Sequence, residues 1–160
     1  MSDRAPKRLR PIDSGDVGEV QRLLCKGFPQ DTPELWRTRL ARQSSLQSDG
    51  LGYLLEAGGI GVGVLLTLRS QRLGPDGASV NVVNLSSWYM EPAYRWSAIG
   101  MLRVAMSDKT AVYTDLTAAP QVAELNRNVG MESWSSGMIL ASAAPFAVLP
   151  GPRGAKVLNL

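Results

Sequence analysis

The chain has no histidine and a single cysteine among its 160 residues, and these absences exclude several kinds of catalytic site. Without histidine there is no Ser-His-Asp or Cys-His nucleophile system, and the common zinc-hydrolase ligand sets are excluded too. Cys25 alone can form no internal disulfide and no cysteine-rich metal site. Its position in the apolar pattern of a helix is typical of a buried, unreactive thiol.

Charge and long apolar runs are also scarce. Charged residues make up 19% of the chain and the net charge is +3, an excess that residues 1–10 supply by themselves. We therefore predict a solvated basic arm over residues 1–8, a neutral body and no nucleic-acid partner. The apolar runs are too short for a membrane span, and the first residues lack the apolar core of a signal peptide, so we expect a cytoplasmic protein.

Hydrophobic residues, at 44%, are sufficient for one core, and we predict a single domain over residues 9–160. A helix is predicted to end near Gly27, and another to start at Thr32 with Pro33 in its first position. Further helices are predicted after Ile99 and from Pro120. Strands are predicted over residues 9–12, 51–57, 60–68, 80–89, 111–117, 131–140 and 155–160. This order favours an α/β fold, a mixed sheet of about six or seven strands with helices on both faces.

Residues 80–106 read as a strand, a turn and a helix, which is the most informative unit of the sequence. In the turn, residues 95–100 place backbone N–H groups at the positive end of a helix, next to the cation Arg95. Ser97, Ala98 and Gly100 are small enough for a ligand to approach the backbone closely. The arrangement is typical of an anion site, most often for phosphate, although every α/β protein has such junctions.

From residue 9 to about residue 140 the chain resembles the GCN5-related N-acetyltransferase (GNAT) family. That family's acetyl-CoA signature is a strand followed by a V-x-P-x-x-R/Q-x-x-G-x-G/A loop and a helix. Residues 90–100 read Met-Glu-Pro-Ala-Tyr-Arg-Trp-Ser-Ala-Ile-Gly, which places Arg95 and Gly100 at the family's positions. The two-helix start, the hairpin at Gly58-Gly59 and the Gly130-Met131 junction also follow the family's order, which implies a largely antiparallel sheet.

The resemblance implies direct acyl transfer from acetyl-CoA, or another acyl-CoA, to an amine on a small molecule or peptide. No metal is implied, and a monomer or a homodimer is expected. The end of the strand would bind pantetheine and polarise the thioester, while the amides of residues 96–100 would hold the pyrophosphate. The residues that the resemblance assigns to CoA are Trp88, Tyr89, Met90, Arg95, Trp96, Ser97, Ala98, Ile99, Gly100 and Asn126.

The sequence departs from the family at two of these positions. Ala98 replaces the first loop glycine, so that a methyl group is expected to face the phosphates, and Asn126 stands where many members have a tyrosine that reprotonates the thiolate. Asp115 and Tyr113 are the candidate catalytic residues, but both residue types in a strand are also typical of hydrogen bonding and sheet packing. Glu91 is predicted to be solvated. The alternative function is therefore a degenerate GNAT-fold protein that binds CoA, another ligand or a partner protein without catalysis.

Overall fold

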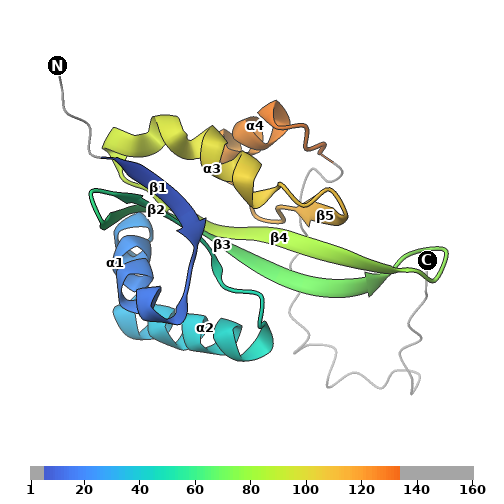
Figure 1. Ribbon diagram of the computed structural model, residues 1–160, viewed down its shortest axis with the longest axis horizontal. Helices are drawn as coiled ribbons and strands as arrows, with labels where there is room; N and C mark the ends of the chain where they lie inside the picture. The colour runs from blue at the N-terminus through green and yellow to red at the C-terminus, as the bar shows by residue number, and fades with distance from the viewer. Residues whose placement is uncertain (1–5, 134–160) are drawn as a thin grey trace, which may run out of the picture.

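The computed structural model describes residues 6–133, in which five strands form one sheet between two layers of helices (Figure 1). The strands lie in chain order, and neighbours are antiparallel except for the parallel last pair. They are β1 (Lys7–Pro11), β2 (Gly52–Ala57), β3 (Ile60–Leu73), β4 (Ser79–Met90) and β5 (Ala111–Thr114). The sheet thus has fewer strands than the predicted six or seven, because the predicted strand at 155–160 and most of that at 131–140 lie outside the described residues.

Two helices cover each face of the sheet, as the sequence predicts (Figure 1). On one face lie α1 (Val17–Gly27) and α2 (Pro33–Leu46), and on the other α3 (Ala98–Ala105) and α4 (Pro120–Asn128). Two 3-10 helices, η1 (Ser14–Asp16) and η2 (Pro92–Ser97), lead into α1 and α3. No helix within residues 6–133 is long and apolar enough to cross a membrane.

Local sequence signals explain where several elements begin and end. The Thr32 side chain accepts a hydrogen bond from the Leu35 N–H and Pro33 occupies the first turn, so α2 starts where its cap predicts. Gly58 and Gly59 have φ of 61° and 80°, the left-handed values that a tight hairpin requires. These glycines join β2 to β3 as predicted.

Because strand side chains alternate between faces, the sheet separates two apolar clusters. On the α1 and α2 face, Val64 and Leu66 pack with Leu23, Leu24 and other buried side chains. The half-buried Cys25 lies against this cluster and is less enclosed than predicted. On the other face Leu65 packs in a second cluster that contains residues of α3.

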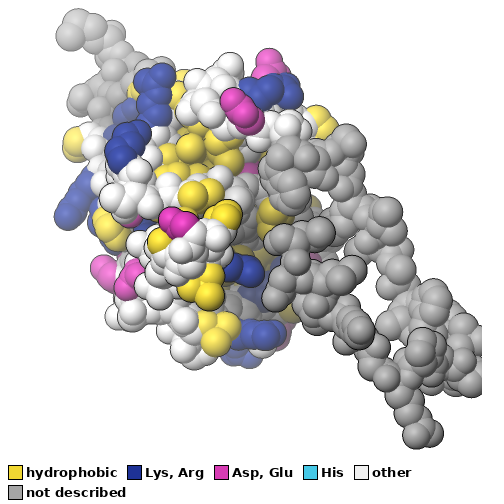
Figure 2. Space-filling view, turned by 90° about the vertical axis from the view of Figure 1, so that its right-hand side faces the viewer, with side chains coloured by type: hydrophobic (Ala, Val, Ile, Leu, Met, Phe, Trp, Pro, Cys, Tyr) yellow, Lys and Arg dark blue, Asp and Glu magenta, His cyan; other side chains and the backbone are white. Residues whose placement is uncertain are grey.

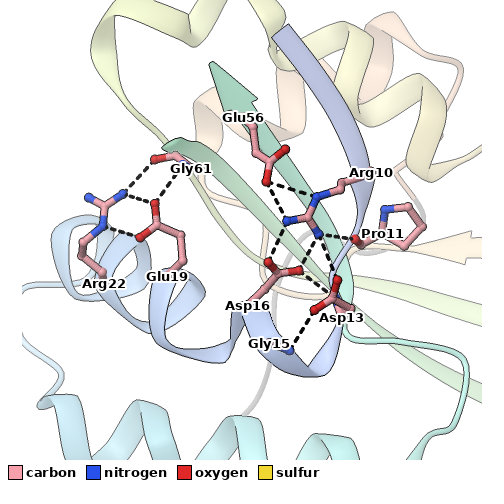
Figure 3. A network of polar contacts seen from close by, with 9 residues as sticks. All are labelled: Arg10, Pro11, Asp13, Gly15, Asp16, Glu19, Arg22, Glu56 and Gly61. Atoms are coloured by element: carbon pink, nitrogen blue, oxygen red, sulfur yellow. Dashed lines mark hydrogen bonds and ion pairs between the residues drawn. The ribbon is translucent and has the colours of Figure 1, made fainter. Parts of the chain in front are cut away.

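The basic arm is shorter than predicted, because β1 begins at Lys7 and pairs with β2 over Lys7–Pro11. Arg10 is not solvated: its guanidinium donates to Asp16 Oδ1 at 2.7 Å and to Glu56 Oε1 at 2.6 Å (Figure 3). Its side chain is only 19% exposed. Arg10 therefore connects the edge strand to η1 and to β2.

The β3–β4 hairpin extends beyond the helices as a two-stranded arm (Figure 1). The arm and the neighbouring strand β5 carry exposed apolar side chains, among them Leu68, Leu73 and Val112. Figure 2, turned so that this end faces the viewer, shows hydrophobic side chains at the surface between charged ones.

Candidate functional site

The site predicted from the sequence begins where β4 separates from β5. The two strands pair only over Asn81–Asn84 and Ala111–Thr114, whereas β4 continues to Met90 alongside β3. Within residues 6–133 no strand pairs with the β5-facing edge of residues 85–90, here called the β4 edge segment. Unpaired backbone N–H and C=O groups at such an edge can bind an extended, amide-containing ligand as a further strand would bind.

A β-bulge reshapes this segment. Leu65 pairs with Trp88 and Thr67 with Leu85, so Ser86 and Ser87 together oppose the single residue between them on β3. Without the bulge, Leu85 and Trp88 would point to opposite faces of the sheet. The extra residue puts both on the same face, where they contact the apolar cluster beneath α3. Met90 lies in that cluster as well, whereas Tyr89 packs on the opposite face, against α1. The three predicted pantetheine residues therefore present side chains to both faces.

The predicted phosphate loop is helical. Residues 92–97 form η2, which continues directly into α3 at Ala98. Ala98 has φ of −57° and is 9% exposed, so its methyl group packs into the core rather than facing a phosphate as expected. Its N–H donates to the Arg95 carbonyl and is thus engaged within the turn. Gly100, in the first turn of α3, has open space at the position a Cβ would occupy.

A pocket of about 370 Å³ lies beside this turn. Lys7, at the start of β1, lies at its rim: Nζ donates to Ser97 Oγ at 3.1 Å and lies 3.2 Å from the centre of the Trp96 ring. The predicted CoA residues Trp96, Ser97 and Gly100 line the pocket, with Leu9, Leu55 and Met101 as its apolar part. Lys7 was not predicted as a site residue, since the sequence placed it in a solvated arm.

Asp115 and Asn126 lie together at the end of the β4–β5 pairing where the two strands separate. Asn126 Nδ2 donates to Asp115 Oδ2 at 2.9 Å, directly after the last paired residue of β5. A carboxylate only accepts hydrogen bonds, so the amide group of Asn126 faces Asp115 and its carbonyl oxygen faces away. That oxygen is buried and has no hydrogen-bond partner among residues 6–133, on a residue that is 5% exposed. We predicted separate roles for these two residues from the sequence, and the structure joins them through a hydrogen bond in which Asn126, an amide, cannot act as an acid.

Tyr113 belongs to a different environment. Its hydroxyl oxygen accepts a hydrogen bond from the Asp108 N–H at 3.2 Å, in the turn that precedes β5. Burial raises the pKa of this phenol above its ordinary value. Tyr113 and Asp115 therefore bond to separate parts of the chain, and the phenol has a structural partner of its own.

A polar cluster at the end of β4 was missed by sequence reasoning. Lys26 Nζ lies 2.6 Å from Glu91 Oε1, and the Tyr89 hydroxyl donates to Glu91 Oε2 at 3.4 Å. Glu91 is half-buried, not solvated as predicted, and the Lys26 ammonium lowers the pKa of its carboxyl group. Burial and the nearby Glu91 charge raise the pKa of Tyr89.

The position of Gly27 permits this cluster, since a Cβ there would lie 2.7 Å from the Tyr89 ring. Lys26 and Glu91 are 65 residues apart, so no local pattern joins them. The one available signal was the position of Glu91 directly after the strand.

The five-stranded, largely antiparallel sheet, its parallel last pair and the strand–turn–helix at residues 79–105 define the GNAT fold, which confirms the predicted resemblance at the level of fold. No protein-family model matches the chain, and no curated protein is significantly similar to it in sequence.

Several solved structures share the fold. An aminoglycoside N-acetyltransferase, AAC(6')-Iy in complex with CoA, is 14% identical, with a TM-score of 0.69 over 89% of this chain and 98% of the other. A predicted acetyltransferase with acetyl-CoA from Clostridium acetobutylicum is 12% identical, with a TM-score of 0.66 over 88% and 98%. Glucosamine-6-phosphate N-acetyltransferase from Arabidopsis thaliana is 11% identical, with a TM-score of 0.62 over 85% and 98%.

Proposed function

We propose that this protein is an acyl-CoA-dependent N-acyltransferase, with acetyl-CoA as its donor and an amine as its acceptor. The observation that carries the proposal is the β4 edge segment, whose backbone has no strand partner toward β5 within residues 6–133. The segment leads directly through η2 into α3, so a ligand bound along it meets the start of that helix. Solved structures of this fold that contain CoA or acetyl-CoA support the same donor.

In this function pantetheine lies along residues 85–90, and a backbone N–H near Trp88 polarises the thioester carbonyl. The cations Arg95 and Lys7 lie on and beside η2, where they favour a pyrophosphate. The acyl group passes directly to the amine, so positioning and the oxyanion contact supply most of the rate. Cys25 has no part in the reaction. The amine acceptor approaches from the α1 side of β4, where the side chains of Tyr89 and Glu91 lie.

A second candidate function is CoA binding without catalysis, and the Asn126–Asp115 pair favours it. Asn126 stands at the tyrosine position of the resemblance and cannot protonate a thiolate. The Ala98 N–H also favours it, because this group donates to the Arg95 carbonyl and is therefore not available to a phosphate. If CoA binds and no amine in a broad panel releases free thiol from acetyl-CoA, this second function holds.

The donor site is tested by the same glycine-to-glutamate substitution at two helix starts. Gly100→Glu puts a carboxylate at the start of α3, and Gly18→Glu puts one at the start of α1; both positions are exposed with open space for a side chain. We expect Gly100→Glu to weaken CoA binding by about tenfold or more in isothermal titration, through repulsion of the phosphates. Gly18→Glu is expected to bind as the wild type does. Equal affinities in the two variants would place the phosphates elsewhere.

A further inference from the structure

The pocket of about 370 Å³ lies between the start of β1 and the start of α3, which are close together in Figure 1. Leu9 of β1 and Leu55 of β2 are a cross-strand pair that lines it, and Met101 lines it from α3. Its volume falls in the range of small-molecule sites, roughly 300–1,000 Å³, and such sites are typically apolar with a few polar groups. The pocket therefore has the size and the lining of a ligand site.

Lys7 supplies the charge of this pocket. Because side chains of a strand alternate between faces, Lys7 shares the α3 face with Leu9, whereas Arg10 lies on the other face. Lys7 Nζ donates to Ser97 Oγ at 3.1 Å and lies 3.2 Å from the centre of the Trp96 ring. The described residues that line the pocket include no carboxylate, and within residues 6–133 Lys7 forms no ion pair with one. A cation beside an apolar pocket favours an apolar ligand that carries an anionic group.

The pocket adjoins the turn to which the proposed function assigns the pyrophosphate of CoA. Trp96, Ser97 and Gly100 line the pocket and also belong to that turn. In CoA the pyrophosphate is bonded to a ribose, and this ribose carries both adenine and a 3′-phosphate. A CoA molecule whose pyrophosphate lies at the turn therefore has its adenine and its 3′-phosphate only one sugar away. Adenine is a flat, largely apolar ring and the 3′-phosphate is an anion, so the two match the apolar lining and Lys7.

We propose that this pocket binds the 3′-phosphoadenosine end of CoA and that Lys7 recognises its 3′-phosphate. This inference rests on the proposed function, because it requires the pyrophosphate at residues 96–100. Arg95 then serves the pyrophosphate and Lys7 the phosphate beyond it. The Lys7 ammonium group has three N–H donors, of which one is directed to Ser97, so the other two are free to donate to a phosphate. Lys7 is thus a specificity-determining residue that favours CoA over dephospho-CoA, which lacks the 3′-phosphate.

The first test is isothermal titration of the full chain with CoA and with dephospho-CoA, at low salt. We expect the wild type to bind CoA about tenfold more tightly, through a charge-assisted hydrogen bond that added salt weakens. Lys7→Gln is expected to reduce this preference to below about threefold and to bind dephospho-CoA as the wild type does, which also shows that the variant is folded. Lys109→Gln is the matched control: Lys109 is exposed in the turn before β5, and the variant should keep the wild-type preference.

The second test locates the adenine. In NMR spectra of the CoA complex, the adenine ring protons are expected to show nuclear Overhauser effects to the methyl groups of Leu9 and Leu55. Complete absence of these effects in a saturated complex would show that the adenine lies outside the pocket and would overturn the inference.

Failure of the inference is distinguishable from failure of the proposed function. If Lys7→Gln weakens the binding of CoA and dephospho-CoA equally, Lys7 contacts the pyrophosphate, so the inference is wrong and the proposed function stands. Equal affinities of the wild type for the two ligands lead to the same conclusion. If CoA does not bind at all, both proposals fail together.

Discussion

Within residues 6–133, the region of α1 and α2 and the region of β5 and α4 are buried to different degrees. On the face of α1 and α2, Leu23, Leu24 and Leu40 have no exposed surface, and charged side chains join neighbouring elements by ion pairs and hydrogen bonds. For example, Arg22 donates to the Gly61 carbonyl and Glu19 accepts from the Gly61 N–H (Figure 3). On the opposite side β5 has four residues, and α4 buries only Asn126 fully.

This contrast separates a scaffold from a ligand-dependent region. The scaffold fixes β4 from the α1 side, so the β4 edge segment has a defined position without any ligand. Among the described residues, the region of β5 and α4 has fewer buried side chains, and regions of this kind open more readily. A ligand that lies between β4 and β5 would stabilise the second region more than the first.

The largest expected effect compares a core leucine from each region. Leu24→Ala removes a completely buried side chain, whereas Leu125→Ala removes a half-buried one on α4. Urea unfolding should show a loss of about 3 kcal/mol for the first and about 1 kcal/mol for the second, because the cost follows the apolar volume removed. Equal losses would break the contrast between scaffold and ligand-dependent region.

A smaller effect is expected from the ion pairs of the scaffold. Arg10→Met keeps the stem of the side chain but leaves the carboxylates of Asp16 and Glu56 without their shared cation, at an expected cost of about 2 kcal/mol at neutral pH. Arg10 lowers the pKa of Asp16 below its ordinary value of 3.8 in the folded protein. Stability from this shift is therefore present above pH 3.8 and is lost as the pH falls through the lowered pKa.

The measurement is urea unfolding of both proteins across that acid range. The wild type should lose the extra stability there, and Arg10→Met should lack this part of the pH dependence. An identical acid profile for the two proteins would mean that the network in Figure 3 does not stabilise the scaffold.

The smallest expected effect concerns Asp115. Its carboxylate accepts from Asn126 and from the Thr117 N–H, which are structural bonds. Asp115→Asn should lower kcat/KM for acetyl transfer only several-fold, since a positioned base contributes about a hundredfold or more. A loss beyond about a thousandfold would identify Asp115 as a catalytic base and give the second region a chemical role.

Much of the fold was predictable because its signals are local. The Thr32 cap and Gly58-Gly59 fix a helix start and a hairpin whatever surrounds them. Strand ends were less predictable: β3 continues to Leu73 because its last residues pair with β4 in an exposed arm. Likewise, residues 92–97 were expected to form an open loop, and no residue type among them specifically predicts the 3-10 helix η2.

The site was predictable only where the chain is continuous. Residues 88–90 and 95–100 could be proposed from the sequence because they follow one another through a strand, a turn and a helix. The Lys26–Glu91 pair and the contact of Lys7 with Ser97 join residues 65 and 90 positions apart. Such contacts depend on how the elements pack, which neither periodicity nor spacing encodes.

The central claim is that CoA binds along the β4 edge segment, and amide hydrogen exchange with and without CoA tests it most directly. We expect CoA to slow exchange in residues 85–90, while residues 81–84, already paired with β5, change little. Slower exchange confined to β1, at the pocket that Lys7 lines, with no change in residues 85–90, would contradict the claim.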